Sequence, residues 1–208
     1  PADGPFADVV SQGVLARSVF DTALVLNATA GPDPHDWRSL PEDPRDYTIG
    51  LDDGVRGLRV GLSLDLGQAK ADAEVREIVA TAARRFEELG AHVEEVGPLF
   101  DPLQSSFEPL WIGGMAVRLR QIPTQLHGKL DPGYCDTAEQ GLAITLADYA
   151  RAYEARSKLA RDMALWHRKY DLLLAPVTPT AAPPVETLYN SPAFPRWTKG
   201  APFTLPFN

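Results

Sequence analysis

Apolar residues recur at helical spacing in the first part of this chain. Ser18-Val19-Phe20-Asp21 has the S-x-x-D form, in which the serine hydroxyl and an acidic group three residues later occupy free backbone N–H groups at a helix start. The pattern predicts a helix from about Val19 to Gly31-Pro32, with one apolar face made of Val19, Ala23, Leu26 and Ala30. A connection rich in Pro, Asp and Gly follows, from His35 to Gly57.

A strand, a helix and a second strand come next. The short apolar run Leu58–Leu62 predicts the first strand, and Asp72 is placed to cap a helix with apolar residues every three to four positions as far as Leu89. Gly90 ends that helix, and Ala91–Val96 predicts the second strand. This order is typical of a right-handed parallel crossover, so the two strands are expected side by side and running the same way.

The second half of the chain is mainly helical in pattern until a late strand. A helical tendency between Phe100 and Leu126 has poorly defined ends, and Asp-Pro-Gly at 131–133 predicts a turn. Thr145-Leu146-Ala147-Asp148 is a second capping box, and it opens the longest helix, which we expect to run to about Tyr170. One side of that helix carries Tyr149, Tyr153, Arg156, Ala160, Met163, His167 and Tyr170.

Leu172–Ala175 is continuously apolar and precedes a Pro-rich loop. Continuous apolarity in a short strand indicates burial on both faces, so we expect this strand at the centre of a sheet.

Composition narrows the classes of partner. The chain has 208 residues, 44% of them hydrophobic, and no apolar run approaches the ~20 residues that a membrane-spanning helix needs. A formal charge of -8 disfavours direct contact with nucleic acid, which requires clustered Lys and Arg. The single cysteine, Cys135, cannot form an internal disulfide, and the first residues lack the basic and apolar regions of a signal peptide. We therefore expect a cytoplasmic protein with no membrane association.

Motifs for catalysis are missing from these residues. The four histidines, His35, His92, His127 and His167, are scattered without metal-ligand spacing, so no metal site is expected. The sequence contains no glycine-rich nucleotide loop, no G-x-S-x-G elbow and no S-x-x-K pair, and we expect no cofactor. Trp111 and Met115, four positions apart, suit either an apolar pocket or a core, and core packing is favoured.

Five segments of the chain resemble one known family. Residues 13–36, GVLARSVFDTALVLNATAGPDPHD, are similar to the stretch that follows the catalytic core in the amidase signature family, with Val14 in place of the usual Pro. The resemblance continues in order through GLRVGLSLDLG (57–67), VREIVATAARRFEELGAHVEEV (75–96), YDLLLAPVTPTAAPP (170–184) and FTLPFN (203–208). Any one segment would be a weak signal, but five in the right order make a strong one.

This resemblance implies an α/β fold. The chain would form part of the amidase-signature α/β/α sandwich, with a mixed central sheet that includes the parallel β-α-β unit, and a helical cap region. The whole of 1–208 would be a single partial domain. Its parts would be a helix with a Pro-rich connection (1–57), the β-α-β unit (58–97), a helical cap with the long helix (98–170), and a buried strand with a Pro-rich loop (171–208).

The family's chemistry is hydrolysis of a carboxylic amide to an acid and an amine or ammonia through a serine acyl-enzyme. Members resemble one another in using a Lys, a cis-peptide Ser and a nucleophilic Ser, and all three lie upstream of the matched segments. We therefore expect an interior fragment that supplies no catalytic residue and is inactive alone. The resemblance implies a small-molecule amide as substrate, leaves a homodimer open, and makes Trp111, Met115, Val177 and Thr178 candidate substrate-binding residues.

Two alternatives remain open at this point. The glutamine-hydrolysing subunit of the tRNA-dependent amidotransferase is similar to the simple amidases, and it grips the glutamine carboxylate with an Arg ahead of the long helix. This chain has no Arg or Lys between Lys129 and Arg151, which disfavours that function. The other alternative is a non-catalytic binding or scaffold module, since a fold does not determine a function.

Overall fold

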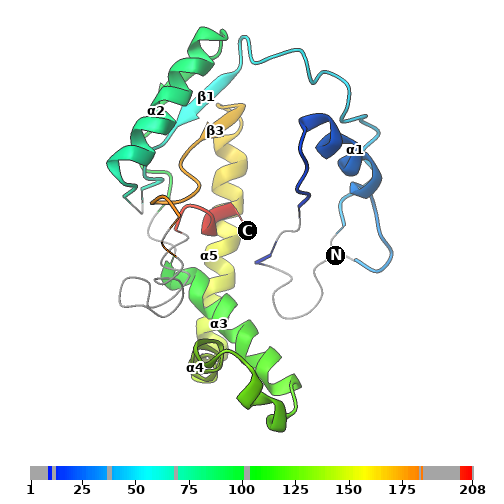
Figure 1. Ribbon diagram of the computed structural model, residues 1–208, viewed down its shortest axis with the longest axis vertical. Coiled ribbons are helices and arrows are strands. Elements are labelled where there is room, and N and C mark those ends of the chain that lie inside the picture. Colours follow the sequence, from blue (N-terminus) through cyan, green and yellow to red (C-terminus); the bar gives the residue numbers. More distant parts are fainter. Residues whose placement is uncertain are drawn as a thin grey trace.

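The structure, a computed structural model, describes residues 9–10, 13–36, 39–67, 70–100, 104–182, 184 and 202–207. Three parallel strands form a sheet in the order β2-β1-β3, with bounds β1 Arg59–Leu62, β2 His92–Glu95 and β3 Leu172–Leu174. In Figure 1 this sheet lies between the helix α2 (Ala73–Glu88) and the upper part of the long helix α5 (Leu146–Trp166). Residues 185–201 of the expected Pro-rich segment lie outside the described residues.

The predicted crossover is confirmed. Strand β1 pairs in parallel with β2, with Val60 opposite Val93, and α2 joins the two strands. Strand β1 begins one residue later than predicted, and β2 is one residue shorter at each end. Asp72 is the N-cap residue of α2, although its side chain accepts no capping hydrogen bond. Gly90 follows the helix with φ +94°, a left-handed conformation that glycine adopts without strain.

The predicted central position of the late strand is wrong for the described sheet. Strand β1 lies between its two neighbours, whereas β3 lies at the edge, and Leu172 is 38% exposed. A run of three leucines is equally compatible with an edge and a central strand, because the order of strands depends on pairings distant in sequence. The three described strands are all parallel, so the antiparallel member expected of a mixed sheet is not among them.

Helical segments fill the described part of the expected helical region. They are α3 (Gln104–Gln121), the 3-10 helix η1 (Thr124–Lys129), α4 (Pro132–Gly141) and α5. The turn predicted at Asp-Pro-Gly is wrong, because the same residues start α4: the Asp131 carboxylate accepts from the Tyr134 N–H at 2.8 Å, and Pro132 occupies the first turn. Proline suits that place because its missing N–H would have no helical partner there.

Helix α5 begins where the sequence predicts and ends earlier. The Asp148 N–H donates to Thr145 Oγ1 at 3.1 Å, and the Thr145 N–H donates to Asp148 Oδ2 at 3.0 Å, which completes the capping box. The helix stops at Trp166 instead of about Tyr170. Its last residue packs across β1, and at Gly61 an added Cβ would lie 2.5 Å from the Trp166 ring. The missing side chain of Gly61 is therefore what lets α5 approach the sheet.

The first helix, α1 (Val19–Thr29), has the predicted start but not a core-facing surface. Ser18 Oγ accepts from the Asp21 N–H at 3.0 Å, as the S-x-x-D pattern indicates. Of the predicted apolar face only Ala23 is buried, and Val19 is 71% exposed. Figure 1 shows α1 to one side of the sheet and α5, joined to β1 by a long connection.

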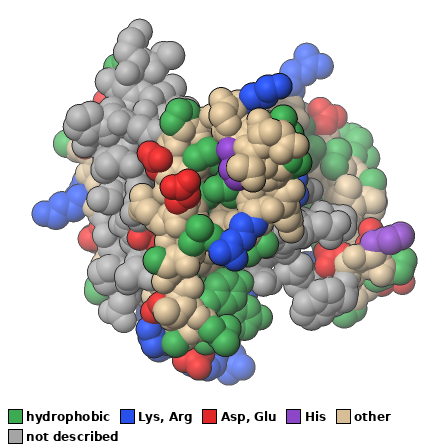
Figure 2. Space-filling view, turned by 90° about the horizontal axis from the view of Figure 1, so that it is seen from below, with side chains coloured by type: hydrophobic (Ala, Val, Ile, Leu, Met, Phe, Trp, Pro, Cys, Tyr) green, Lys and Arg blue, Asp and Glu red, His purple; other side chains and the backbone are tan. Residues whose placement is uncertain are grey.

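Charged and hydrophobic side chains are interspersed on the face formed by the lower end of the molecule. Figure 2 shows Lys and Arg beside Asp and Glu there, and neither sign forms a continuous patch among the described residues. No helix in the described part of the chain is both long and apolar enough to cross a membrane.

Candidate functional site

A cavity of about 220 Å³ lies between α3, α5 and the short 3-10 helix η4 (Leu205–Phe207). Most of its wall is apolar, and α5 with its C-cap residue His167 supplies half of the lining from one helical face. The lining consists of Val9, Ser106, Phe107, Leu110, Ala152, Ala155, Arg156, Leu159, Ala160, Met163, His167, Leu205, Pro206 and Phe207. A concave apolar wall with a few polar groups is typical of a small-molecule site.

Packing of α3 against α5 shapes this cavity. Phe107, Leu110, Ala152 and Leu205 belong to one buried cluster at the cavity wall. The Phe107 ring also stacks on Trp111 at 6.0 Å between centroids, which fixes its orientation. Alanines on α5 leave the space that larger side chains would fill, so the cavity follows from the small residues in the helical pattern.

Two nitrogen-bearing side chains from α5 and its end reach the cavity. Arg156 is half-buried and its Nε is fully buried, yet this guanidinium donates no hydrogen bond and forms no ion pair within the described residues. His167 is held by a 3.2 Å contact between Nδ1 and the Tyr170 carbonyl oxygen. Because a carbonyl only accepts, Nδ1 carries the proton, and Nε2 of the neutral ring is then an acceptor.

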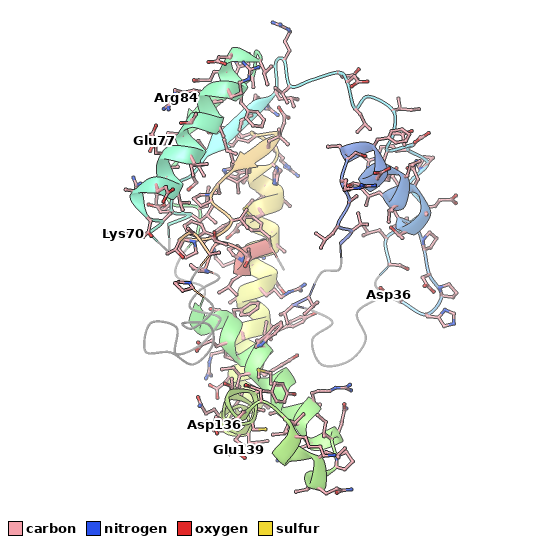
Figure 3. The ribbon with its side chains drawn as sticks, viewed as in Figure 1. Asp36, Lys70, Glu77, Arg84, Asp136 and Glu139 are labelled. Carbon is pink, nitrogen blue, oxygen red and sulfur yellow. The ribbon has the colours of Figure 1, made fainter. Side chains whose placement is uncertain are left out.

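Within the described residues, no three His, Cys, Asp or Glu side chains converge as metal ligands. Among the acids labelled in Figure 3, Asp36 and Glu77 lie on separate parts of the molecule, away from Asp136 and Glu139, which lie together on α4. Because its wall is apolar apart from a few polar side chains, the cavity can bind an apolar body with one polar or charged end. Its described lining contains no nucleophile that is hydrogen-bonded to a base.

Trp111 and Met115 lie one and two turns further along α3 than the cavity residue Phe107. Met115 is only 6% exposed and packs with Leu119 and Ala138 between α3 and α4. Trp111 is partly buried and contacts this cluster as well as the one at the cavity wall. Neither side chain lines the 220 Å³ cavity, and their role in substrate binding stays a prediction.

Val177 and Thr178 lie beyond the carboxyl end of β3, away from the other two candidates in sequence and lining neither described pocket. Val177 is 68% exposed, and Thr178 Oγ1 donates to the Thr180 carbonyl at 3.0 Å. The loop that carries them is tied to the start of α2, because the Asp72 N–H donates to the Pro179 carbonyl at 2.8 Å. Their contact with substrate also stays a prediction.

Sequence reasoning missed the residues that do line the cavity, above all Phe107, Arg156 and the segment 205–207. A signal for one of them was present, because Arg156 falls on the same side of the long helix as Ala160 and Met163. A cation on a mainly apolar side of a helix is unfavourable when it is buried, unless a protein group or a ligand pairs with it. The contribution of 205–207 had no such signal, since it depends on contact with residues about 50 positions earlier.

A bidentate ion pair fixes the sheet on which α5 rests. Arg59 Nη2 lies 2.8 Å from Asp171 Oδ1, and the Arg59 Nε and backbone N–H both donate to Asp171 Oδ2 at 3.1 and 2.8 Å. Hydrogen bonds from the Arg59 side chain, followed by its backbone N–H, lower the pKa of Asp171 from 3.8 to about 2. This pair joins the start of β1 to the start of β3.

The sequence model of the family described as "Amidase" matches residues 4–208, which is nearly the whole chain. The chain belongs to the amidase family. An acylamidase of Rhodococcus erythropolis is 29% identical over 99% of this chain, and a glutamyl-tRNA(Gln) amidotransferase subunit of Ligilactobacillus salivarius is 28% identical over 90%. The chain spans 44% of the length of each of these amidase-family relatives.

The fold of this amidase-family chain is also that of solved relatives. The structure of 6-aminohexanoate cyclic dimer hydrolase matches 92% of this chain with a TM-score of 0.77 at 21% identity, and 44% of that protein is covered. At this level of identity the match speaks for the fold alone. The α/β architecture expected from the resemblance is thereby confirmed.

Proposed function

We propose that this chain is the substrate-pocket segment of an amidase that hydrolyses carboxylic amides through a serine acyl-enzyme. The observation that carries the proposal is the family match over 4–208 together with an apolar cavity between α3 and α5. An amide with an apolar body would place that body against Phe107, Leu110 and Leu205. The chain alone would be inactive, because the Lys and the two Ser of the family's chemistry would come from outside the matched segments.

The chemistry of acyl transfer separates substrate binding, which we assign to this segment, from bond breaking, which we assign to other parts of the enzyme. A positioned serine attacks the amide carbonyl, the amine or ammonia leaves, and water then releases the acid. Rate depends on holding the carbonyl within reach of the nucleophile, so a cavity that grips the apolar body contributes through orientation. Residues of this segment would bind and orient the substrate, and the bond-breaking groups would lie elsewhere in the enzyme.

A chimaera tests this proposal. Residues 1–208 replace the matched segment of the Rhodococcus acylamidase, and amine release is measured with an anilide and with glutamine. We expect hydrolysis of the anilide by the chimaera and none by the 208-residue chain alone. A fluorophosphonate that labels active serines controls for assembly of the chimaera. A chimaera that folds and is labelled but releases no amine contradicts the proposal, and turnover by the isolated chain contradicts its second part.

Glutamine hydrolysis within an amidotransferase is the second candidate, because relatives of both names match the chain. The segment from 130 to 150, which forms α4 and leads into α5, has no Arg or Lys to pair with a glutamine carboxylate. Preferential release of ammonia from glutamine by the same chimaera would reverse the order of the two candidates.

A further inference from the structure

We propose that the cavity between α3 and α5 selects ligands with an apolar body and a carboxylate end, and that Arg156 binds the carboxylate. This inference rests on the proposed function, because the bound ligand is a substrate only if the enzyme is an amidase. The preferred amides would then carry an acidic group on the part held in the cavity. The first support is the state of Arg156, whose Nε is buried with no hydrogen-bond acceptor in the described part of the chain.

A buried Nε–H without an acceptor is unfavourable. A buried polar group without a hydrogen bond loses its interaction with water and gains nothing in exchange, and a charged group loses more. Two other cations of α5 are paired with acids on the same helix: Arg151 lies 2.5 Å from Asp148 and Lys158 lies 2.5 Å from Asp162. Arg156, between them in sequence, has neither an acid nor a carbonyl partner among the residues that the structure describes.

The second support is the cavity itself, which brings this cation to an apolar wall. Arg156 lines the cavity together with Phe107, Leu159 and Leu205. The guanidinium presents N–H donors in a planar fork that matches the two oxygens of a carboxylate. In surroundings poor in water this pairing is stronger than at an exposed surface.

The described lining contains no Asp or Glu that would repel an anion. With Nδ1 held by the Tyr170 carbonyl, His167 leaves Nε2 as an acceptor for a ligand donor. The chemical class that fits is therefore a small aryl or alkyl carboxylate. A neutral apolar molecule would leave the cation unpaired, and a polar amino acid would leave the aromatic and aliphatic wall unused.

Isothermal titration of the 208-residue chain with 4-phenylbutyrate and with 4-phenylbutyramide tests the proposal, because the two probes share a body and differ in charge. We expect the carboxylate to bind at least about tenfold more tightly, as a charge-assisted hydrogen-bonded pair allows. In Arg156→Gln that preference should disappear while the affinity for the amide is unchanged. Arg156→Lys should keep part of the preference, because charge remains but the fork is lost.

Arg161→Gln is the matched control, since it removes one positive charge from an exposed position of the same helix that does not line the cavity. Circular dichroism establishes that each variant is folded. If Arg156→Gln does not fold, the wild-type preference for the carboxylate is measured at low and high salt, where we expect it to fall as salt rises.

Equal affinity for the two probes, no binding of either, or a preference that survives in Arg156→Gln overturns the inference. The proposed function is judged separately, by anilide hydrolysis in the chimaera. A chimaera that hydrolyses neutral anilides but shows no carboxylate preference would reject the role of Arg156 and leave the amidase proposal in place.

Discussion

Single residues decide how closely the elements of this protein approach one another. Gly61 lets the Trp166 ring lie directly on β1, and Gly141 lets α4 approach α3, where an added Cβ would lie 2.2 Å from the Ile112 carbonyl oxygen. Whereas these glycines permit a close approach, the Arg59–Asp171 ion pair holds the starts of β1 and β3 together. Glycine and an ion pair thus set distances that no hydrophobic pattern encodes.

Replacing Gly61 by Val tests the close approach of α5 to the sheet. The new side chain would overlap the Trp166 ring, so we expect the free energy of unfolding to fall by about 1–3 kcal/mol in urea denaturation. Gly97→Ala is the control, because a Cβ there meets nothing within 4 Å. Equal stability of Gly61→Val and wild type would mean that α5 does not pack on β1 as described.

Asp171→Asn tests the pair at the strand starts through its pH dependence. The pKa of Asp171 is lowered to about 2, so the carboxylate stabilises the fold above the unfolded-state value near 3.8 and loses that effect as pH falls through about 2. Wild type should therefore melt at a higher temperature than the variant at neutral pH, with the difference shrinking between about pH 4 and pH 2.

The control for that titration is Glu77→Gln, which breaks the exposed 2.9 Å pair with Arg84 on the outer side of α2 (Figure 3). Exposed pairs contribute little to stability, so this variant should melt close to wild type. A gap between Asp171→Asn and wild type that is constant from pH 7 to pH 2 would contradict the assignment.

At the level of elements, the starts of α1 and α5 follow local chemistry, whereas helix ends and exposure do not. The N-cap hydrogen bond at Ser18 and the capping box at Thr145 both place their helices as predicted, because these hydrogen bonds join residues three positions apart. The predicted end of α5 and the turn predicted at the start of α4 are both wrong. Asp-Pro-Gly is compatible with a turn and with a helix start, and only its place beside α3 separates the two.

Thr145→Ala should destabilise the protein by about 1 kcal/mol, the usual cost of losing an N-cap side chain. Ser157→Ala, on the exposed side of the same helix, should change stability little, because its hydroxyl only bonds back to the Tyr153 carbonyl. Urea denaturation measures both. A Thr145→Ala variant as stable as Ser157→Ala would show that the box does not hold the start of α5.

For the whole molecule, the main feature is the apolar surface of α1. Val19, Phe20 and Leu24 are each about half exposed or more on a helix that has the capping and composition of a core element. Exposed apolar side chains that gather in one patch promote association. The sequence left a homodimer open, and we expect the exposed face of α1 to take part in any self-association of the isolated chain.

Serine substitution at Val19, Phe20 and Leu24 together tests that expectation. The wild-type chain should bind a fluorescent apolar dye and sediment partly as assemblies, and the triple variant should do both less, with little change in melting temperature. Ile78→Ser on α2, also exposed, is the control for loss of a single apolar side chain. Identical sedimentation of the triple variant and wild type would rule out a role for the α1 face.

Sequence patterns are enough to predict the starts of α1, α2 and α5, the parallel crossover of β1 and β2, and membership of a family, because these features depend on spacing within short segments and on their order. Contacts between distant segments place β3 at the edge of the described sheet, leave the α1 face exposed, and bring Phe107, Arg156 and Leu205 together in one cavity. Those outcomes depend on which segments pack together across long stretches of chain. Local periodicity indicates that a residue favours burial, but it does not identify the segment against which that residue packs.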